Sequence, residues 1–529
     1  MTDLAWPEGR LAPSLGAACR RWAGRPAVTS GATTITYAGL GRAVARLAGA
    51  YRRLGIAPGD RIVCQLPNST EHLVAVNAAW AVGAVHVGAD HDLTGRELGW
   101  LAARTEAAAL LYGPRASAPE PLVPVRAVRA AHPATRIILH GIVDDEDHDD
   151  LSALLAGPDE LDDITPPHGR HDTAHLLLTS GTTGEPKAVR ETLPACWAKM
   201  QFFADAFRPT PADVHLLYLP MAHVFGLRLA QLALLSGGRL VVAERFSPTG
   251  ALELVTGEKV TVLPGMPAHF TLLLDALDPA RHRVDSLRWA ISAASNLPRP
   301  LAEQIYDRLG VDLLYVYGCS ENFTVLSTDR DEISRGSVGH TVFRGPEGTP
   351  PNGTVGVLDP GSGRPLAPGQ VGEIAFGASH PVPYWKAPDA ATDGWYRTGD
   401  LGRIDPDGSV YVLGRLKELV NRGGLHVSPS EIETAAAAHA GVADCAVVGT
   451  PDAVLGEVIC ACVVAAGAAP PDLGRLRAFL APTLARHKLP DELCVLEAIP
   501  RTKIGKVDRA ALLADVLADG RPRERWRGR

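Results

Sequence analysis

The sequence predicts an α/β protein with a large N-terminal domain, built from two α/β subdomains plus a small β-rich subdomain, followed by a small α+β C-terminal domain. Three observations predict this class. Helix-like and strand-like patterns alternate through the first 170 residues and again over residues 214–316, short strands with Gly and Pro turns occupy residues 353–400, and a further unit begins beyond residue 415. At 529 residues the chain is too long for one compact core, and its length predicts roughly two to four domains or subdomains.

The two α/β stretches contain clear local signals. Residues 34–37 predict a strand, residues 41–54 an amphipathic helix rich in Ala, Leu and Arg, and residues 61–66 a second strand. The most apolar stretch, residues 73–89, is interrupted by Asn77, Gly83 and His86, so it predicts a buried helix running into a strand and not a membrane span. In the second stretch, residues 260–264 and 289–294 are expected to be strands that end in loops.

The C-terminal unit predicts a compact α+β domain. A helix is expected to open at Ser430, strands at residues 445–449 and 458–464, and another helix from about residue 473. The acidic run at residues 144–150 lacks ligand periodicity and predicts a solvated loop, not a metal site. The tail, residues 521–529, carries five Arg and is expected to be disordered.

Composition excludes several classes of partner. The apolar fraction of 46% and the charged fraction of 21% are those of an ordinary globular protein, and a formal charge of −7 favours neither nucleic acid nor an anionic membrane. The eight Cys are scattered, and the close pair Cys460 and Cys462 lies in a strand-like run, which indicates free buried thiols. With no basic or apolar start at the N-terminus, we expect a cytoplasmic protein without a secretory signal.

One short segment after the apolar run 176–178 has the composition of a phosphate-handling loop. Glycines let backbone N–H groups approach an anion, hydroxyls donate to phosphoryl oxygens, and a lysine supplies a positive charge. The residue order does not fit a Walker A motif, and by composition alone a glycine-rich surface turn fits equally well. The segment consists of Thr179, Ser180, Gly181, Thr182, Thr183, Gly184, Glu185, Pro186 and Lys187.

Four further motifs decide between these interpretations. They are Tyr317-Gly318-Cys319-Ser320-Glu321, Gly394-Trp395-Tyr396-Arg397-Thr398-Gly399-Asp400, Gly414-Arg415-Leu416-Lys417 and Pro500-Arg501-Thr502-Lys503-Ile504-Gly505-Lys506. Taken singly, Tyr317 fits a core aromatic, Asp400 a turn residue and Lys506 a surface lysine. With the five motifs in this order, the chain resembles the adenylate-forming superfamily over essentially its whole length: acyl-CoA synthetases, aryl-acid ligases, peptide-synthetase adenylation domains and luciferases.

The resemblance implies a reaction and its cofactors. A carboxylate attacks the α-phosphate of ATP, pyrophosphate leaves, and the acyl-AMP is then attacked by a thiol, usually that of CoA or of a phosphopantetheinyl carrier. ATP and Mg²⁺ are therefore expected, with CoA as co-substrate. The implied domains are residues 1–415, with the AMP site and acid pocket, and residues 416–529, a mobile lid that rotates about a hinge near Lys417.

The resemblance also implies roles for individual residues. The loop from Thr179 to Lys187 would cover the β- and γ-phosphates. Tyr317, next to Gly318, would stack on adenine, Ser320 would contact the α-phosphate, and Glu321 would help to hold Mg²⁺. Asp400 would accept from both ribose hydroxyls with Arg415 beside it.

Lys506 would reach the reacting oxygens. Rotation of residues 416–529 would then move Lys506 away and bring the loop at residues 421–426 into its place. In relatives, a glycine at the position of Gly424 lines the thiol tunnel. The chain departs from the family pattern by having Ser320 for Thr, Ala188 for Gly and Glu418 for Asp, and its hinge residue is Lys417 where Asp is commoner.

The segment at residues 220–226 resembles the family's acid-pocket motif. His223 would lie near the substrate carboxylate, and the expected pocket residues are His223, Val224, Phe225, Ser292, Ala293, Ala294, Gly318 and Cys319. Hydroxybenzoate-activating relatives have Asn where this chain has Val224, which disfavours a salicylate-type acid. No Asp stands in this motif to bind an α-ammonium group. An aryl, arylalkenoyl or medium aliphatic acid with a neutral side group is therefore expected.

Four functions remain open from the sequence. The leading one is an ATP-dependent acid–CoA ligase. The others are an aryl-acid ligase that loads a separate carrier protein, an enzyme whose acyl-AMP or adenylated oxyanion, such as nitrite, is captured by an amine, and a non-catalytic nucleotide-binding relative. The presence of Glu321, Asp400, Arg415 and Lys506 counts against the last.

Overall fold

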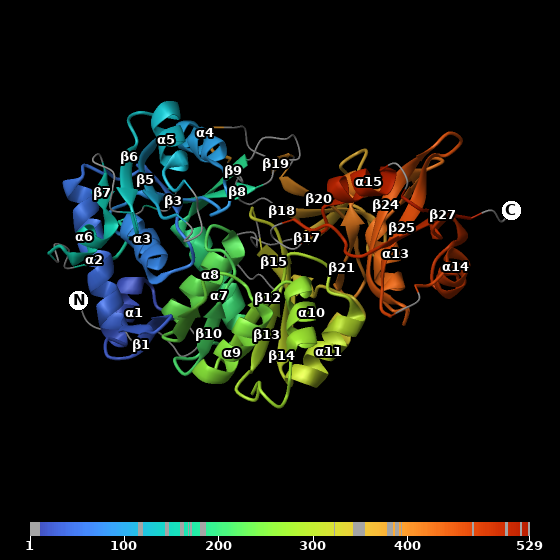
Figure 1. Cartoon of the computed structure of the whole chain (residues 1–529), viewed down its shortest axis with the longest axis horizontal. Coiled ribbons are helices and arrows are strands. Elements are labelled where there is room, and N and C mark those ends of the chain that lie inside the picture. Colours follow the sequence, from blue (N-terminus) through green and yellow to red (C-terminus); the bar gives the residue numbers. More distant parts are fainter. Residues whose placement is uncertain are drawn as a thin grey trace.

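Four β-sheets with flanking helices make up the chain (Figure 1). The computed structural model describes residues 11–114, 120–142, 148–158, 163–167, 169, 172–179, 187–321, 323–341, 355–377, 384–386, 391–392, 394–467, 470–502, 506–518 and 521–526. In Figure 1 the N-terminal elements lie at one end of the long axis and the orange and red C-terminal elements at the other. No helix of these described ranges is long and apolar enough to cross a membrane.

The first sheet has seven strands in the order β7-β6-β5-β3-β4-β8-β9, all parallel except for the β8–β9 hairpin. Its strands are β3 (Arg61–Gln65), β4 (Val85–Gly88), β5 (Ala107–Tyr112), β6 (Arg136–Leu139), β7 (Asp149–Asp150), β8 (Thr173–Thr179) and β9 (Lys187–Thr192). Ile62 and Cys64 join one apolar cluster and Val63 joins another, so both faces of the sheet are covered. The helices of this part are α2 (Tyr37–Arg53), α3 (Thr70–Ala81), α4 (Gly95–Thr105), α5 (Val123–Ala131) and α6 (Leu151–Ala156).

The second sheet has nine strands in the order β16-β15-β14-β13-β12-β10-β11-β1-β2, with parallel pairing from β14 through β1. Its strands are β1 (Pro26–Ser30), β2 (Thr33–Thr36), β10 (Val214–Leu217), β11 (Arg239–Val242), β12 (Val262–Gly265), β13 (Trp289–Ser292), β14 (Asp312–Gly318), β15 (Phe323–Ser327) and β16 (His340–Thr341). Its helices are α1 (Leu15–Arg21), α7 (Leu193–Phe207), α8 (Val224–Leu235), α9 (Pro248–Glu258), α10 (Pro267–Ala276), α11 (Arg299–Leu309) and α12 (Arg330–Ser334).

The remaining two sheets are antiparallel or mixed. The five-stranded sheet contains β17 (Val355–Leu358), β18 (Gly372–Gly377), β19 (Ala391–Thr392), β20 (Trp395–Ile404) and β21 (Val410–Arg415). A short 3₁₀ turn, η1 (Leu416–Glu418), leads to the six-stranded sheet of β22 (Val420–Arg422), β23 (Leu425–Val427), β24 (Val442–Asp452), β25 (Gly456–Ala465), β26 (Glu492–Leu496) and β27 (Glu524–Arg525). The flanking elements are α13 (Pro429–Ala436), α14 (Leu473–Leu480), η2 (Arg486–Lys488) and α15 (Arg509–Leu517).

The predicted fold class is confirmed, including the buried helix that precedes a strand in the apolar stretch, which is α3 followed by β4. Several element boundaries differ from the expected ones, among them the start of α2 at Tyr37 and of β12 at Val262, and two of the differences have a clear local cause. The strand expected at residues 34–37 ends at Thr36, because the Thr36 hydroxyl accepts from the Gly39 amide and caps α2. The strand expected at residues 289–294 ends at Ser292, after which Ala294 takes a positive φ of 74°. Within the acidic run, Asp149 and Asp150 form β7 and Asp150 caps α6, whereas residues 143–147 lie outside the described ranges.

The expectation of a disordered tail is wrong for residues 521–526. Arg525 pairs with Glu492 in the β26–β27 ladder, and Arg523 Nη1 lies 3.0 Å from Glu492 Oε2. Arg525 also forms an ion pair with Asp452. Composition alone could not show this order, because the carboxylates that hold the arginines are distant in the sequence.

Candidate active site

The strand order of the nine-stranded sheet reverses next to β10, which makes a topological switch point of the kind where open α/β sheets form a crevice. From β10 the chain continues to β11 on one side, while β12 lies on the other side of β10. In open α/β sheets, ligands bind outside the carboxyl ends of the strands at such a switch point, because the loops after the two strands diverge there. The segment 218–223 follows β10, and Met266 follows β12.

His223 stands at this switch point, at the N-cap of α8, and it has a partner that follows a strand of the other sheet. Its Nε2 lies 2.9 Å from Asp90 Oδ2, and both side chains are about one-third exposed or less (34% and 26%). Asp90 follows the carboxyl end of β4 in the seven-stranded sheet. The carboxylate that pairs with His223 thus comes from a part of the sequence far from residues 220–226.

The two sheets are fixed against each other close to this pair. Asn68 Nδ2 donates to Leu219 O at 3.0 Å, and Met221 N donates to Asn68 Oδ1 at 3.1 Å. A Cβ atom on Gly88 would lie 2.8 Å from Ala222 O, so only glycine permits this approach of β4. The surroundings of His223 are therefore set by buried backbone contacts.

The other expected pocket residues follow the carboxyl edge of neighbouring strands. Ser292 ends β13 and is buried together with Ala293, and Gly318 ends β14 with Cys319 half-buried beyond it. Val224 and Phe225 form the first turn of α8. The structure thus places the expected pocket residues on β13, β14 and α8, next to the switch point.

Asp400 lies at the centre of a second group of side chains, which includes Tyr317 and Arg415. Tyr317 Oη donates to Asp400 Oδ2 at 2.7 Å, and Arg415 Nε lies 2.9 Å from Asp400 Oδ1. Asp400 and Arg415 are also direct partners in the β20–β21 ladder. Burial raises the pKa of Asp400, against the opposing effects of Arg415 and Tyr317. Burial, followed by the charge of Asp400, raises the pKa of the Tyr317 phenol.

Lys506 joins this group from the C-terminal sheet domain. Arg501 and Val507 pair as a β-bridge, and Thr502 N donates to Lys506 O at 2.7 Å, so Lys506 lies at one base of a tight hairpin. Its half-buried ammonium interacts with both Arg415 and Asp400. Burial and then the charge of Arg415 lower the pKa of Lys506 from its ordinary value.

Glu321 faces the base of the β8–β9 hairpin. Tyr384 Oη donates to Glu321 Oε1 at 2.8 Å, and Lys199 Nζ donates to Glu321 O at 3.3 Å. Tyr384 forms a β-bridge with Val189 of β9, and Lys187 Nζ lies 5.2 Å from the centre of the Tyr384 ring. The carboxylate of Glu321 is a hard oxygen donor, which fits Mg²⁺, and the cations Lys187, Arg415 and Lys506 fit phosphate.

Part of the predicted phosphate loop falls outside the described residues. This applies to Ser180, Gly181, Thr182, Thr183, Gly184 and to the side chain of Thr179. The described ends, Thr179 and Lys187, pair directly in the β8–β9 ladder. Ser320 lies in the bend between Cys319 and Glu321.

The link to the C-terminal sheet is short. Lys417 is exposed in the single turn η1, and its neighbour Glu418 forms an ion pair with Arg509 at 2.8 Å. Gly424 has a φ of 88°, which favours glycine, and a Cβ there would meet no atom of the described residues within 4 Å.

Sequence reasoning missed several residues of the site. Asp90 has a usable signal, since it follows a buried strand at its carboxyl end. Tyr396 lies inside a recognised motif and shares a hydrogen bond with Tyr384. Tyr384 and Lys199 have no local signal, because their contacts depend on how distant elements pack.

Comparison with known proteins identifies the family. The model described as "AMP-binding enzyme" matches residues 15–382, and that of the "AMP-binding enzyme C-terminal domain" matches residues 431–506. The chain belongs to the AMP-binding enzymes. It is 33% identical to a 2-hydroxy-7-methoxy-5-methyl-1-naphthoate–CoA ligase of Streptomyces carzinostaticus, over 96% of this chain and 93% of that one. It is 32% identical to a feruloyl-CoA synthase of Amycolatopsis, over 91% and 94%, and to a salicyl-AMP ligase / salicyl-S-ArCP synthetase of Mycobacterium tuberculosis, over 96% and 91%.

Solved structures agree with this assignment. ATP-bound MatB from Rhodopseudomonas palustris superposes with a TM-score of 0.82 at 28% identity, covering 95% of this chain and 99% of that one. The amide bond synthetase McbA from Marinactinospora thermotolerans gives a TM-score of 0.82 at 27% identity, with the same coverage. This AMP-binding enzyme is an AMP-forming acid–thiol ligase that uses ATP and Mg²⁺ to make an acyl-adenylate.

Proposed function

We propose that this AMP-binding enzyme activates an aryl or arylalkenoyl acid with a neutral ring substituent and transfers the acyl group to CoA. The observation that carries the proposal is the convergence of Tyr317, Asp400, Arg415 and Lys506 beside the switch-point crevice that holds His223. An acid seated near His223 and a nucleotide seated near Asp400 would meet between these two groups. Relatives that act on a naphthoate and on ferulate support an aromatic acid.

At the nucleotide end, Asp400 would exchange its bond from Tyr317 for the two ribose hydroxyls, which leaves the Tyr317 ring to stack on adenine. An ionised carboxylate can accept both hydroxyl protons, and Arg415 keeps it ionised. Glu321, with Tyr384 holding its Oε1, would bind Mg²⁺ next to the phosphates. Mg²⁺ would neutralise charge on the phosphates and leaving pyrophosphate.

At the reacting centre, Lys506 and Ser320 would act on the α-phosphate. The substrate carboxylate oxygen forms a bond to the α-phosphorus, and the bond to the pyrophosphate oxygen breaks with its electron pair. The Lys506 ammonium would stabilise the negative charge that accumulates on these oxygens, which is an electrostatic role. The position of Lys506 beside Asp400 and Arg415 fits the adenylation arrangement of the two domains.

At the acid end, His223 would orient the substrate carboxylate, with Asp90 fixing the imidazole. Val224, Phe225, Ser292, Ala293, Ala294, Gly318 and Cys319 would surround the rest of the acid. These groups are neutral, and Val224 offers no amide for a phenolic hydroxyl at the ortho position. We therefore place salicylate among the poorer substrates, although a salicyl-AMP ligase is among the relatives.

For the second half-reaction, we propose that residues 416–529 rotate about Lys417 relative to residues 1–415. The apolar clusters of the C-terminal sheet contain only residues between 420 and 516, so this unit has a core of its own. Rotation would withdraw Lys506 and bring Gly424 to the thiol path. Since a Cβ on Gly424 meets no described atom in the present arrangement, Gly424→Ala is expected to spare adenylation and to slow thioester formation.

A pyrophosphate-release screen over carboxylic acids tests the substrate and the acceptor together. We expect release with cinnamate- or naphthoate-type acids and CoA-dependent thioester formation. Turnover confined to aliphatic acids would contradict the assigned pocket. If the enzyme releases pyrophosphate and transfers the acyl group to a holo-carrier protein but not to CoA, the acceptor is a separate carrier protein and not CoA.

Two alternatives have support of their own. The relative described as a salicyl-S-ArCP synthetase favours a carrier protein as acceptor, and the amide bond synthetase among the solved structures favours capture of the acyl-AMP by an amine. Adding amines, holo-carrier or nitrite to the same screen distinguishes them. The eight cysteines are all free, six of them buried, which supports a reducing compartment such as the cytoplasm.

A further inference from the structure

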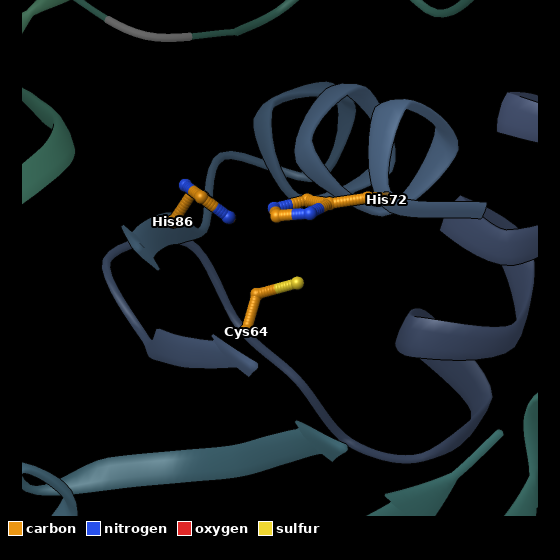
Figure 2. Close-up of side chains that lie close together, drawn as sticks. All are labelled: Cys64, His72 and His86. Atoms are coloured by element: carbon orange, nitrogen blue, oxygen red, sulfur yellow. The ribbon is translucent and has the colours of Figure 1, made fainter. Parts of the chain in front are cut away.

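Three side chains with metal-ligating atoms converge in the core beneath α3, away from the adenylation site. Cys64 is on β3, His72 on α3 and His86 on β4, and their ligand atoms lie within 4.8 Å of one another. We call these three residues the Cys/His cluster. Figure 2 shows a ring nitrogen of each imidazole directed at the other ring, with the Cys64 sulfur close to the His72 ring. All three side chains are buried, with exposures of 1% or less.

His72 has the tautomer of a metal ligand. Its Nδ1 lies 3.3 Å from Pro67 O, and a carbonyl oxygen only accepts, so Nδ1 carries the proton. Burial lowers the pKa of His72 to about 4, which leaves the ring neutral. Its Nε2 is therefore a bare lone pair, and it is buried without a hydrogen-bond partner among the described residues. A backbone carbonyl on one nitrogen and a ligand on the other is the usual arrangement of a metal-bound histidine.

His86 is oriented in a similar way. Its Nδ1 lies 2.9 Å from Nδ1 of His175, and the two rings stack with centroids 4.8 Å apart. When His86 donates in this bond, its Nε2 is also a lone pair, and that atom too is buried with no partner in the described part of the chain. Buried polar atoms without a hydrogen-bond partner destabilise the fold. A ligand that accepts both lone pairs would remove this penalty.

We propose that Cys64, His72 and His86 form a binding site for one zinc ion, or for a cation of the same soft class. One thiolate and two neutral imidazoles are the donors that zinc prefers. Small ring tilts would bring the donors to Zn–N and Zn–S bonds of roughly 2.0–2.3 Å. Binding would release the thiol proton of Cys64. The buried Tyr51 hydroxyl neighbours Cys64 and, in the described residues, has no other partner, so it can bond the thiolate or a water on the ion.

The site would support the acid end of the active site without touching substrate. Cys64 is four residues before Asn68, which binds the loop at Leu219 and Met221. His86 is four residues before Asp90, which pairs with His223. A zinc ion would thus fix β3, α3 and β4 to one another next to the two loops that position His223.

Metal analysis of the purified full-length enzyme tests the proposal. After expression with zinc and removal of free metal, we expect about one equivalent of zinc per chain, retained in the presence of excess Mg²⁺. The metal-depleted enzyme should bind Co²⁺ with a thiolate-to-cobalt charge-transfer band and should gain thermal stability on zinc addition. These measurements need no variant and do not depend on activity.

Variants identify the ligands. Cys64→Ala should lose the charge-transfer band, and His72→Gln should lose most of the bound zinc. His215→Gln is the matched control, because His215 is equally buried with an orphaned Nε2 but has no cysteine ligand beside it in the described chain. Absence of the band in the wild-type enzyme, a band that survives in Cys64→Ala, or equal zinc loss in the His215 control would each overturn the proposal.

Discussion

The proposed acid end and the proposed nucleotide end of the active site are built in different ways. Around His223, the two parallel sheets are in contact through buried backbone and amide bonds, so this region is rigid before substrate arrives. Around Asp400, the side chains come from two sheets and one further segment: Tyr317 from the nine-stranded sheet, Asp400 and Arg415 from the five-stranded sheet, and Lys506 from the segment between β26 and α15.

Under the proposed function, this difference would separate selection from catalysis. The region around His223 would select the acid by shape, because neighbouring strands fix the surrounding residues. The proposed nucleotide end is made of separate parts, so Lys506 would enter or leave it when the six-stranded sheet moves. Such a movement would switch the enzyme between adenylation and thioester formation. Changes at the nucleotide end should therefore affect the rate of adenylation most, and changes at the acid end should affect acid affinity.

The largest effect is expected from Lys506→Ala. Loss of the ammonium should reduce adenylation by roughly 10²–10³-fold, because its stabilisation is greatest in the transition state. Affinity for ATP should change only a few-fold. ATP–pyrophosphate exchange and equilibrium ATP binding measure the two quantities.

Arg501→Ala is the control for this change, since Arg501 is on the same hairpin but pairs with Asp444. Full exchange activity in Lys506→Ala would refute the assigned role.

Asp400→Asn is expected to have the second-largest effect on activity. An amide cannot accept from both ribose hydroxyls and Arg415 as a carboxylate does, so KM for ATP should rise roughly 10- to 100-fold. Asp405→Asn, which lies directly after β20 and is bonded to Arg403, should leave KM unchanged. An unchanged KM in Asp400→Asn would mean that ribose binds elsewhere.

A smaller effect is expected from Asp90→Asn at the acid end. The pair with His223 is partly exposed and contributes about 1 kcal/mol, so KM for the acid should rise about 5-fold. KM for ATP is the internal control and should stay the same. A rise in KM for ATP without a rise in KM for the acid would contradict the proposed roles of the two ends.

The smallest expected effect is a displaced alkaline limb in the pH profile. The functional ammonium of Lys506 is present below its pKa and is lost as pH rises through it. Burial and Arg415 lower that pKa from 10.5. As the pH is raised, kcat/KM for ATP–pyrophosphate exchange should therefore begin to decrease at a pH lower than 10.5. In Lys506→Arg the limb should move to higher pH, whereas an unchanged limb would assign it to another group.

Sequence reasoning predicted the architecture correctly and named most of the candidate site, because both have local signals. Hydrophobic periodicity predicted α3 and β4, and the motifs around Tyr317, Asp400 and Arg415 brought together residues that the structure joins by hydrogen bonds. The prediction of disorder was wrong for residues 521–526, where Glu492 pairs with Arg523, and Asp90 and Tyr384 were missed. Each of these depends on a partner far away in the chain.

By itself, the sequence determined the fold class and the family and named the candidate residues for ATP binding, since these follow from periodicity and from motifs of adjacent residues. Only the tertiary structure decided which of these side chains contact one another. It brought Asp90 to His223, Tyr384 to Glu321, and the hairpin of Lys506 to Asp400. Such pairings depend on the order of strands in a sheet and on how sheets pack, and no local pattern of residues specifies either.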